Sequence, residues 1–88
     1  MTKRPLSPYS EAVSKRFIEA VDSLIERKIV RSKRGFCLSI GMPHSSNLKR
    51  IGDHPELYSL SVDQVCKIVY MYKVSPEWLL TGRGEMFE

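Results

Sequence analysis

Residues 32–51 read SKRGFCLSIGMPHSSNLKRI, and this stretch indicates the fold class of the chain. Ser32 is a good N-cap for a short helix over 33–40, because its side-chain oxygen can accept from an otherwise free backbone N–H. Gly41 then ends this helix in the usual way. The apolar residues of the helix fall on one side, which is expected to be buried: Phe36, Cys37 and Ile40.

A second short helix follows the break. Pro43 prevents the first helix from continuing, and either His44 or Ser45 can cap a restart. Gly52 is expected to end this second helix after about two turns. Its buried side is marked by two apolar residues three positions apart, Leu48 and Ile51. Two short helices joined by a tight Gly-containing turn have the pattern of a helix-turn-helix motif.

Positive charge is concentrated around the same stretch. From Arg27 to Arg50 the chain has seven Lys or Arg and no acid. Residues 1–50 carry a net charge of +7, whereas residues 51–88 carry −3. A protein that binds a DNA duplex must neutralise phosphates and must present a narrow rigid element to the major groove. A cationic pair of short helices meets both needs, although a basic run can also be no more than a solvated helix face.

The other helices are predicted from caps and periodicity. Residues 1–10 contain two prolines and are expected to form an irregular basic arm, in which Lys3 and Arg4 could reach a minor groove. Ser10 is expected to cap a helix that starts at Glu11 and ends near residue 28. With 11–88 as one helical domain, we predict an all-α fold of five helices.

Two C-terminal helices have clear starting signals. Ser61 and Gln64 form a capping box for a helix over 62–72. Ser75 caps a second helix, with Pro76 at its first position, and Gly82 ends this helix after residue 81.

Length and composition suggest one small cytoplasmic domain. Eighty-eight residues leave no room for a second catalytic or sensory domain. No apolar run is long enough to cross a bilayer, and residues 1–10 lack the apolar stretch of a secretion signal. Both cysteines, Cys37 and Cys66, lie in apolar helical patterns and are expected to be reduced and buried.

The sequence resembles the phage-repressor and Cro-like (XRE-type) helix-turn-helix family of bacterial and phage regulators. The resemblance covers residues 13–87 and is carried by three blocks, SKRGFCLSIGM, SSNLKRI and VSPEWLLTGRGEMF, which begin at residues 32, 45 and 74. It implies a lambda-repressor-like domain that acts as a homodimer on a palindromic operator. It also implies a cytoplasmic, nucleoid-associated protein. The turn at 41–44 is one residue longer than is usual in the family.

Helix geometry assigns the DNA-contacting side chains. With Leu48 and Ile51 buried, the opposite face of the second short helix is centred near Ser46. Arg50 has the fork geometry for guanine O6 and N7, and Asn47 could bond adenine. The start of the helix over 33–40 combines positive charge with free backbone N–H groups, which suit a phosphate. The predicted DNA-binding residues are Ser32, Lys33, Arg34, His44, Ser45, Ser46, Asn47, Lys49 and Arg50.

A protein-interaction module, such as an antitoxin or an adaptor, is the alternative function. An exposed Leu38, the acidic loop over 53–60 and the long turn favour it. No enzyme site can be assembled from the available acids, cysteines and histidines, and no cofactor or small-molecule ligand is expected. A metal site would have to use Cys37, His44, His54 and Cys66, whose spacing is irregular. No metal site is therefore predicted.

The C-terminal residues are rich in apolar side chains. Trp78 and Leu79 are expected to close the core. Part of the remaining group, Leu80, Met86 and Phe87, is expected to form a two-fold dimer contact, because a short terminal segment cannot hide so many apolar side chains alone.

Overall fold

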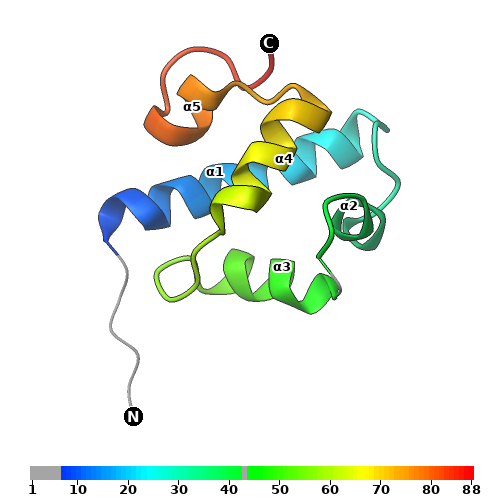
Figure 1. Ribbon diagram of the computed structural model, residues 1–88, viewed down its shortest axis with the longest axis horizontal. Coiled ribbons are helices and arrows are strands. Elements are labelled where there is room, and N and C mark those ends of the chain that lie inside the picture. Colours follow the sequence, from blue (N-terminus) through cyan, green and yellow to red (C-terminus); the bar gives the residue numbers. More distant parts are fainter. Residues whose placement is uncertain (1–6, 43) are drawn as a thin grey trace.

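The computed structural model describes residues 7–42 and 44–88, and within these ranges it contains five helices and no strand (Figure 1). An isolated antiparallel bridge joins Val74 to Phe87. The predicted all-α class is therefore confirmed for the described residues. The predicted arm cations Lys3 and Arg4, and the break at Pro43, lie outside them. The helices are α1 (Pro8–Glu26), α2 (Lys33–Ser39), α3 (Ser45–Asp53), α4 (Val62–Tyr72) and α5 (Pro76–Thr81).

The first helix begins earlier than predicted. It starts at Pro8 rather than Glu11, and the Ser7 side chain, not that of Ser10, is the cap, accepting from the Ser10 N–H at 3.3 Å. The prediction was wrong because Pro8 was treated only as a helix breaker. A proline at the first helical position removes an N–H that has no intrahelical partner anyway, and its fixed φ suits the helix. The predicted end near residue 28 is also late, since the helix ends at Glu26.

The α2 and α3 helices follow the predicted pattern except at one end. Ser32 Oγ accepts from the Gly35 N–H at 3.1 Å, and Gly41 takes a φ of 78° after the helix end. The prediction that Gly52 ends α3 was wrong. A glycine weakens a helix by about 1 kcal/mol but does not end it while backbone hydrogen bonds continue. Here the His54 N–H donates to the Arg50 carbonyl at 2.9 Å.

The two C-terminal helices have the predicted bounds and caps. The Ser61 N–H donates to Gln64 Oε1 at 2.9 Å, and the Gln64 N–H donates to Ser61 Oγ at 3.1 Å, which completes the capping box of α4. Ser75 Oγ accepts from the Trp78 N–H at the start of α5. Gly82 follows α5 with a φ of 79°.

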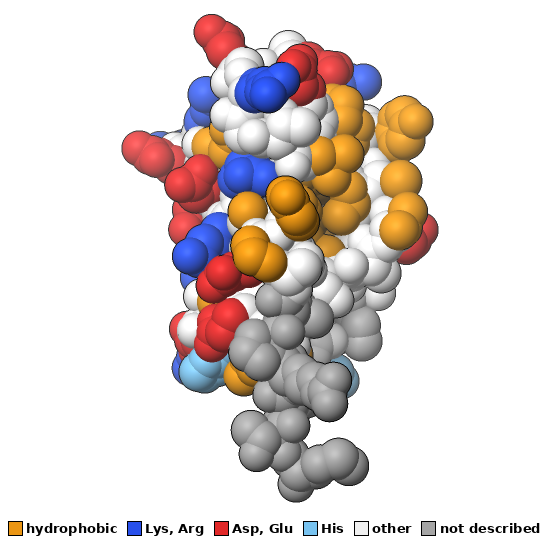
Figure 2. Space-filling model, turned by 90° about the vertical axis from the view of Figure 1, so that its left-hand side faces the viewer, with side chains coloured by type: hydrophobic (Ala, Val, Ile, Leu, Met, Phe, Trp, Pro, Cys, Tyr) orange, Lys and Arg blue, Asp and Glu red, His pale blue; other side chains and the backbone are white. Residues whose placement is uncertain are grey.

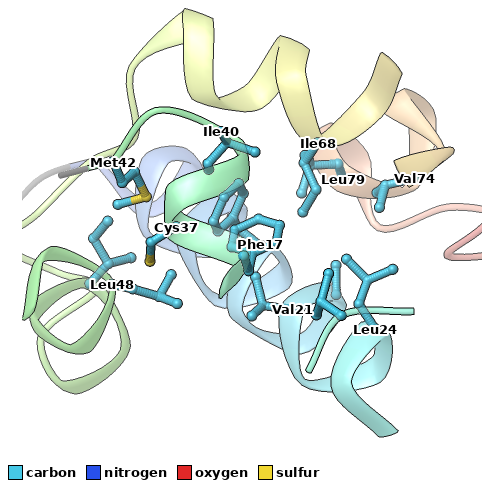
Figure 3. Packing of buried hydrophobic residues seen from close by; sticks show 14 of the residues in the cluster. Phe17, Val21, Leu24, Cys37, Ile40, Met42, Leu48, Ile68, Val74 and Leu79 are labelled. Atoms are coloured by element: carbon cyan, nitrogen blue, oxygen red, sulfur yellow. The ribbon is translucent and has the colours of Figure 1, made fainter. Parts of the chain in front are cut away.

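One hydrophobic core joins all five helices. Phe36 of α2 lies at its centre, with ring centroids 5.7 Å from Phe17 of α1 and 5.4 Å from Tyr72 of α4. Figure 3 shows Cys37 and Leu48 together at the α2–α3 end of this core. The predicted burial of Trp78 and Leu79 is confirmed. Other core members are Val21, Leu24, Ile40, Met42, Ile51, Ile68 and Val74.

The two cysteines differ in burial. Cys37 is free and buried, as predicted, and this burial raises the pKa of its thiol. Cys66 is free but exposed, so its predicted burial was wrong. Ile68 is the most buried residue of α4, and Cys66 lies two positions before it, about 200° away around the helix.

None of the helices in the described part of the chain has both the length and the apolar character that a membrane span requires.

Candidate nucleic-acid interface

The α2–α3 turn is held by backbone and side-chain contacts. The Met42 N–H donates to the Cys37 carbonyl at 2.8 Å, and the Met42 side chain is buried in the core. From α4, Lys67 Nζ donates to the Ile40 carbonyl at 3.2 Å. These contacts attach the segment that follows α2 to α2 itself, to the core and to α4.

The outer face of α3 has the predicted composition. Leu48 and Ile51 are buried, while Ser46, Lys49 and Arg50 are exposed. Asn47, predicted on the flank of this face, is half-buried. Figure 1 shows α3 along the lower edge of the molecule, with the other helices above it. The outer face of α3 is therefore free of the other helices.

The start of α2 lies beside the first turns of α3. Lys33 shares a shallow groove with Ser45, Ser46 and Lys49, and Asp53 lines the same groove. Of the two acids in the segment 53–60, Asp53 therefore lies beside the cations, while Glu56 Oε1 lies 3.4 Å from His54 Nδ1.

A second groove adjoins the first. It combines Arg34 and Leu38 of α2 with His44, Ser45 and Ser46. The structure thus brings together predicted residues from both short helices. Ser32, also predicted, is occupied as the cap of α2 and lies at the edge of this surface.

Asn47 and Arg50 line a third hollow, away from α2. Its other walls include Ser59 and Gln64, which the sequence prediction did not include. These two residues belong to the end of the loop before α4 and to the first turn of α4. Only the tertiary fold brings this segment next to Arg50, and no local sequence signal indicates it.

Four cations of this surface have no partner within the described part of the chain. Lys33, Arg34, Lys49 and Arg50 are exposed, and none forms an ion pair or a side-chain hydrogen bond within residues 7–42 and 44–88. Elsewhere Lys15 pairs with Glu11 at 3.8 Å and Lys67 with Asp63 at 2.9 Å. The surface is therefore positively charged and can accept anionic groups without breaking an internal ion pair.

Among the described residues, no three or more His, Cys, Asp or Glu side chains are grouped so that they could hold a metal ion. Comparisons with protein-family models, curated proteins and solved structures give no match to this chain. The resemblance to the phage-repressor family therefore stays a prediction from the sequence blocks.

Proposed function

We propose that this protein is a sequence-specific double-stranded DNA-binding regulator of transcription, with α2 and α3 acting as a helix-turn-helix unit of the lambda-repressor type. One observation carries the proposal. Four cations that have no ion pair among the described residues, Lys33, Arg34, Lys49 and Arg50, surround the uncovered face of one short helix. A phosphate backbone is the polyanion that such a surface fits, and a helix is the element that enters a major groove.

The dimensions of α3 suit this role. An α-helix with its side chains is about 10–12 Å across and the major groove of B-DNA is about 12 Å wide, so the nine-residue helix α3 can lie in the groove. Arg50 would read guanine through O6 and N7, and Asn47 beside it could bond adenine. Ser45 and Ser46, at the start of α3, would contact bases or phosphate.

The remaining cations would position the protein. Lys33 and Arg34 stand beside the start of α3, where they would hold the phosphates of one groove wall, and Lys49 would hold a phosphate from α3 itself. His44 and Ser32 lie at the edges of the same surface. The proposal involves no catalytic step, cofactor or metal, and it places the protein in the bacterial cytoplasm at its operator.

A protein partner is the second candidate function. Leu38 is 62% exposed and lies in the groove that contains Arg34 and the start of α3. An exposed leucine flanked by a cation suits an amphipathic segment of a partner protein, as the function of an antitoxin or an adaptor would require. Dependence of binding on DNA sequence and salt separates the two functions.

Selection of bound sequences from a random duplex pool tests the proposal. We expect an inverted repeat to be enriched at near-physiological salt. Binding to that site should weaken with salt with a log–log slope of about −4 to −5, because about 4 to 6 phosphates are neutralised. Recovery of no motif by folded protein, together with a shallow salt response, would contradict DNA reading and favour the protein partner.

A further inference from the structure

A row of apolar side chains lies on the outer side of α4. Val62, Cys66 and Tyr70 follow one another at intervals of four residues and are exposed, Val62 by 79% and Tyr70 by 76%. Ile68 points to the core from the opposite side of the helix. We call Val62, Cys66 and Tyr70 the α4 ridge. Single exposed apolar residues are ordinary, but an aligned row on one helix is the pattern of a packing surface.

The figures place this surface on an uncovered side of the molecule. In Figure 1, α4 lies in front of α1, and no other helix lies in front of α4. Figure 2 shows hydrophobic side chains gathered toward the side that faces the viewer in Figure 1. The outer side of α4 is therefore available to another molecule.

The C-terminal residues expected to form a dimer contact are mostly used inside the chain. Met86 and Phe87 are half-buried and pack against the core. The Arg27 guanidinium lies 4.4 Å from the centre of the Phe87 ring, and the backbone of Phe87 bridges to Val74. Leu80 alone of the three predicted residues stays exposed. The larger apolar surface left for a partner is the α4 ridge.

We infer that a second copy of this chain docks on the α4 ridge, with the two α4 helices antiparallel. The inference rests on the proposed function in one respect, since a palindromic operator requires two copies. A two-fold contact demands a surface that complements itself. The α4 ridge does so in shape, because its midpoint at Cys66 would face the midpoint of the same ridge on the partner.

Charge at the two ends of α4 supports the antiparallel arrangement. Asp63 stands in the first turn, where it pairs with Lys67 of the same helix at 2.9 Å, and its side chain is still 71% exposed. Lys73 follows the last turn and is exposed, with no ion pair among the described residues. Antiparallel packing brings each Asp63 toward the partner's Lys73 at both ends of the contact. A parallel arrangement would place like charges together instead.

The position of α4 also suits a dimer that binds DNA. Figure 1 shows α5 on one side of α4 and the α2–α3 unit on the other. A two-fold axis perpendicular to α4, directed from α5 toward the α2–α3 unit, makes the two α4 helices antiparallel. The same axis leaves both α2–α3 units at one end of the dimer, where a single duplex can contact both.

Sedimentation velocity of the full chain without DNA tests this interface, from about 10 to about 500 μM protein, because a contact built on so few side chains should be weak. We expect the wild type to shift toward dimer as concentration rises. Tyr70→Lys should raise the dissociation constant about tenfold or more. Tyr9→Lys is the matched control, since Tyr9 is 85% exposed on α1 and should leave association unchanged.

A charge-reversal pair tests the orientation. Lys73→Glu and Asp63→Lys should each weaken association, and the double variant should restore it, with folding of every variant checked by circular dichroism. A wild type that stays monomeric, a Tyr70→Lys variant that associates like wild type, or a double variant without rescue would each overturn the inference. Because no DNA is present, these failures are distinct from a failure of DNA binding, which the duplex selection reports.

Discussion

The helices α1 and α4 each contain a cation that is bound internally, whereas the α2–α3 unit leaves its cations free. Lys67 donates to the Ile40 carbonyl and pairs with Asp63, and Arg16 Nε donates to the Leu79 carbonyl at 2.7 Å. By contrast, Lys33 and Arg50 have no such contacts among the described residues. Cations of the first kind stabilise the fold. Those of the second kind repel one another, and this repulsion is relieved only by an external anion.

Helix ends show the same difference. The α4 helix has a complete capping box, whereas His44 at the start of α3 makes no side-chain cap hydrogen bond. The α3 helix is therefore stabilised mainly by Leu48 and Ile51 in the core. Its polar side chains remain available to a partner, as a DNA-recognition helix would require.

The largest expected effect comes from the residue that joins the two regions. Phe36→Ala should lower the free energy of unfolding by about 3 to 5 kcal/mol, because Phe36 contacts rings from α1 and α4 at the centre of the core. Urea denaturation followed by circular dichroism measures this. Leu38→Ala, two positions away and exposed, should change stability by less than about 0.5 kcal/mol. Equal losses in both variants would contradict the packing described for α2.

Arg50→Ala tests the free cations of α3. It should remove about 1 to 3 kcal/mol of discrimination at one base position while leaving stability unchanged. Repeating the duplex selection with this variant shows the relaxed position. Arg83→Ala removes an exposed cation from the other end of the molecule and should leave the selected motif intact. An unchanged motif with Arg50→Ala would mean that α3 is not placed in the groove as proposed.

Lys67→Met tests a cation that is bound internally. Loss of its hydrogen bond to the Ile40 carbonyl should lower the free energy of unfolding by about 1 kcal/mol. Affinity for all DNA sequences should fall to a similar extent, because the α2–α3 turn loses a stabilising contact. Thermal unfolding and titration with the selected duplex measure the two effects. Asp63→Asn removes the ion pair but keeps the bond to Ile40, so an equal loss of stability in both variants would assign that loss to the ion pair.

Lys33→Ala should have a smaller and nonspecific effect. Affinity for every duplex should fall by less than about tenfold, and the log–log salt slope should become shallower by about 1, because one phosphate contact is lost. Fluorescence anisotropy at several salt concentrations measures the slope. Lys15→Ala, a paired cation of α1, serves as the control. A changed base preference with Lys33→Ala would place Lys33 at a base edge.

The smallest expected effect concerns Cys37. Burial raises the pKa of this thiol above its ordinary value of 9.0. The neutral thiol is therefore retained in the folded state at a pH where the unfolded chain releases the proton. Below pH 9 this group leaves stability independent of pH. As pH rises above 9, stability should fall by less than about 1.4 kcal/mol per pH unit. Urea titrations at several pH values should show this loss of stability above pH 9 in the wild type and not in Cys37→Ala.

The accuracy of the sequence prediction varied along the chain with the strength of local signals. The bounds of α4 and α5 followed from Ser61, Gln64 and Ser75, whose hydrogen bonds reach only three residues along the chain. Pro8 and Gly52 were misjudged because each residue is compatible with two local structures. At both positions the backbone hydrogen bonds of the neighbouring residues decide which one forms.

The sequence by itself determined the all-α class, most helix bounds, the buried side of each short helix and the polar face of α3, because caps and periodicity act over one or two turns. Only the tertiary structure decided that Lys33 and Arg34 stand beside the start of α3, that Ser59 adjoins Arg50, and that Cys66 lies outside. The first two relations join different elements of the fold, beyond the one or two turns over which local signals act. They depend on how Phe36, Ile68 and Leu79 pack in one core, which no local pattern contains.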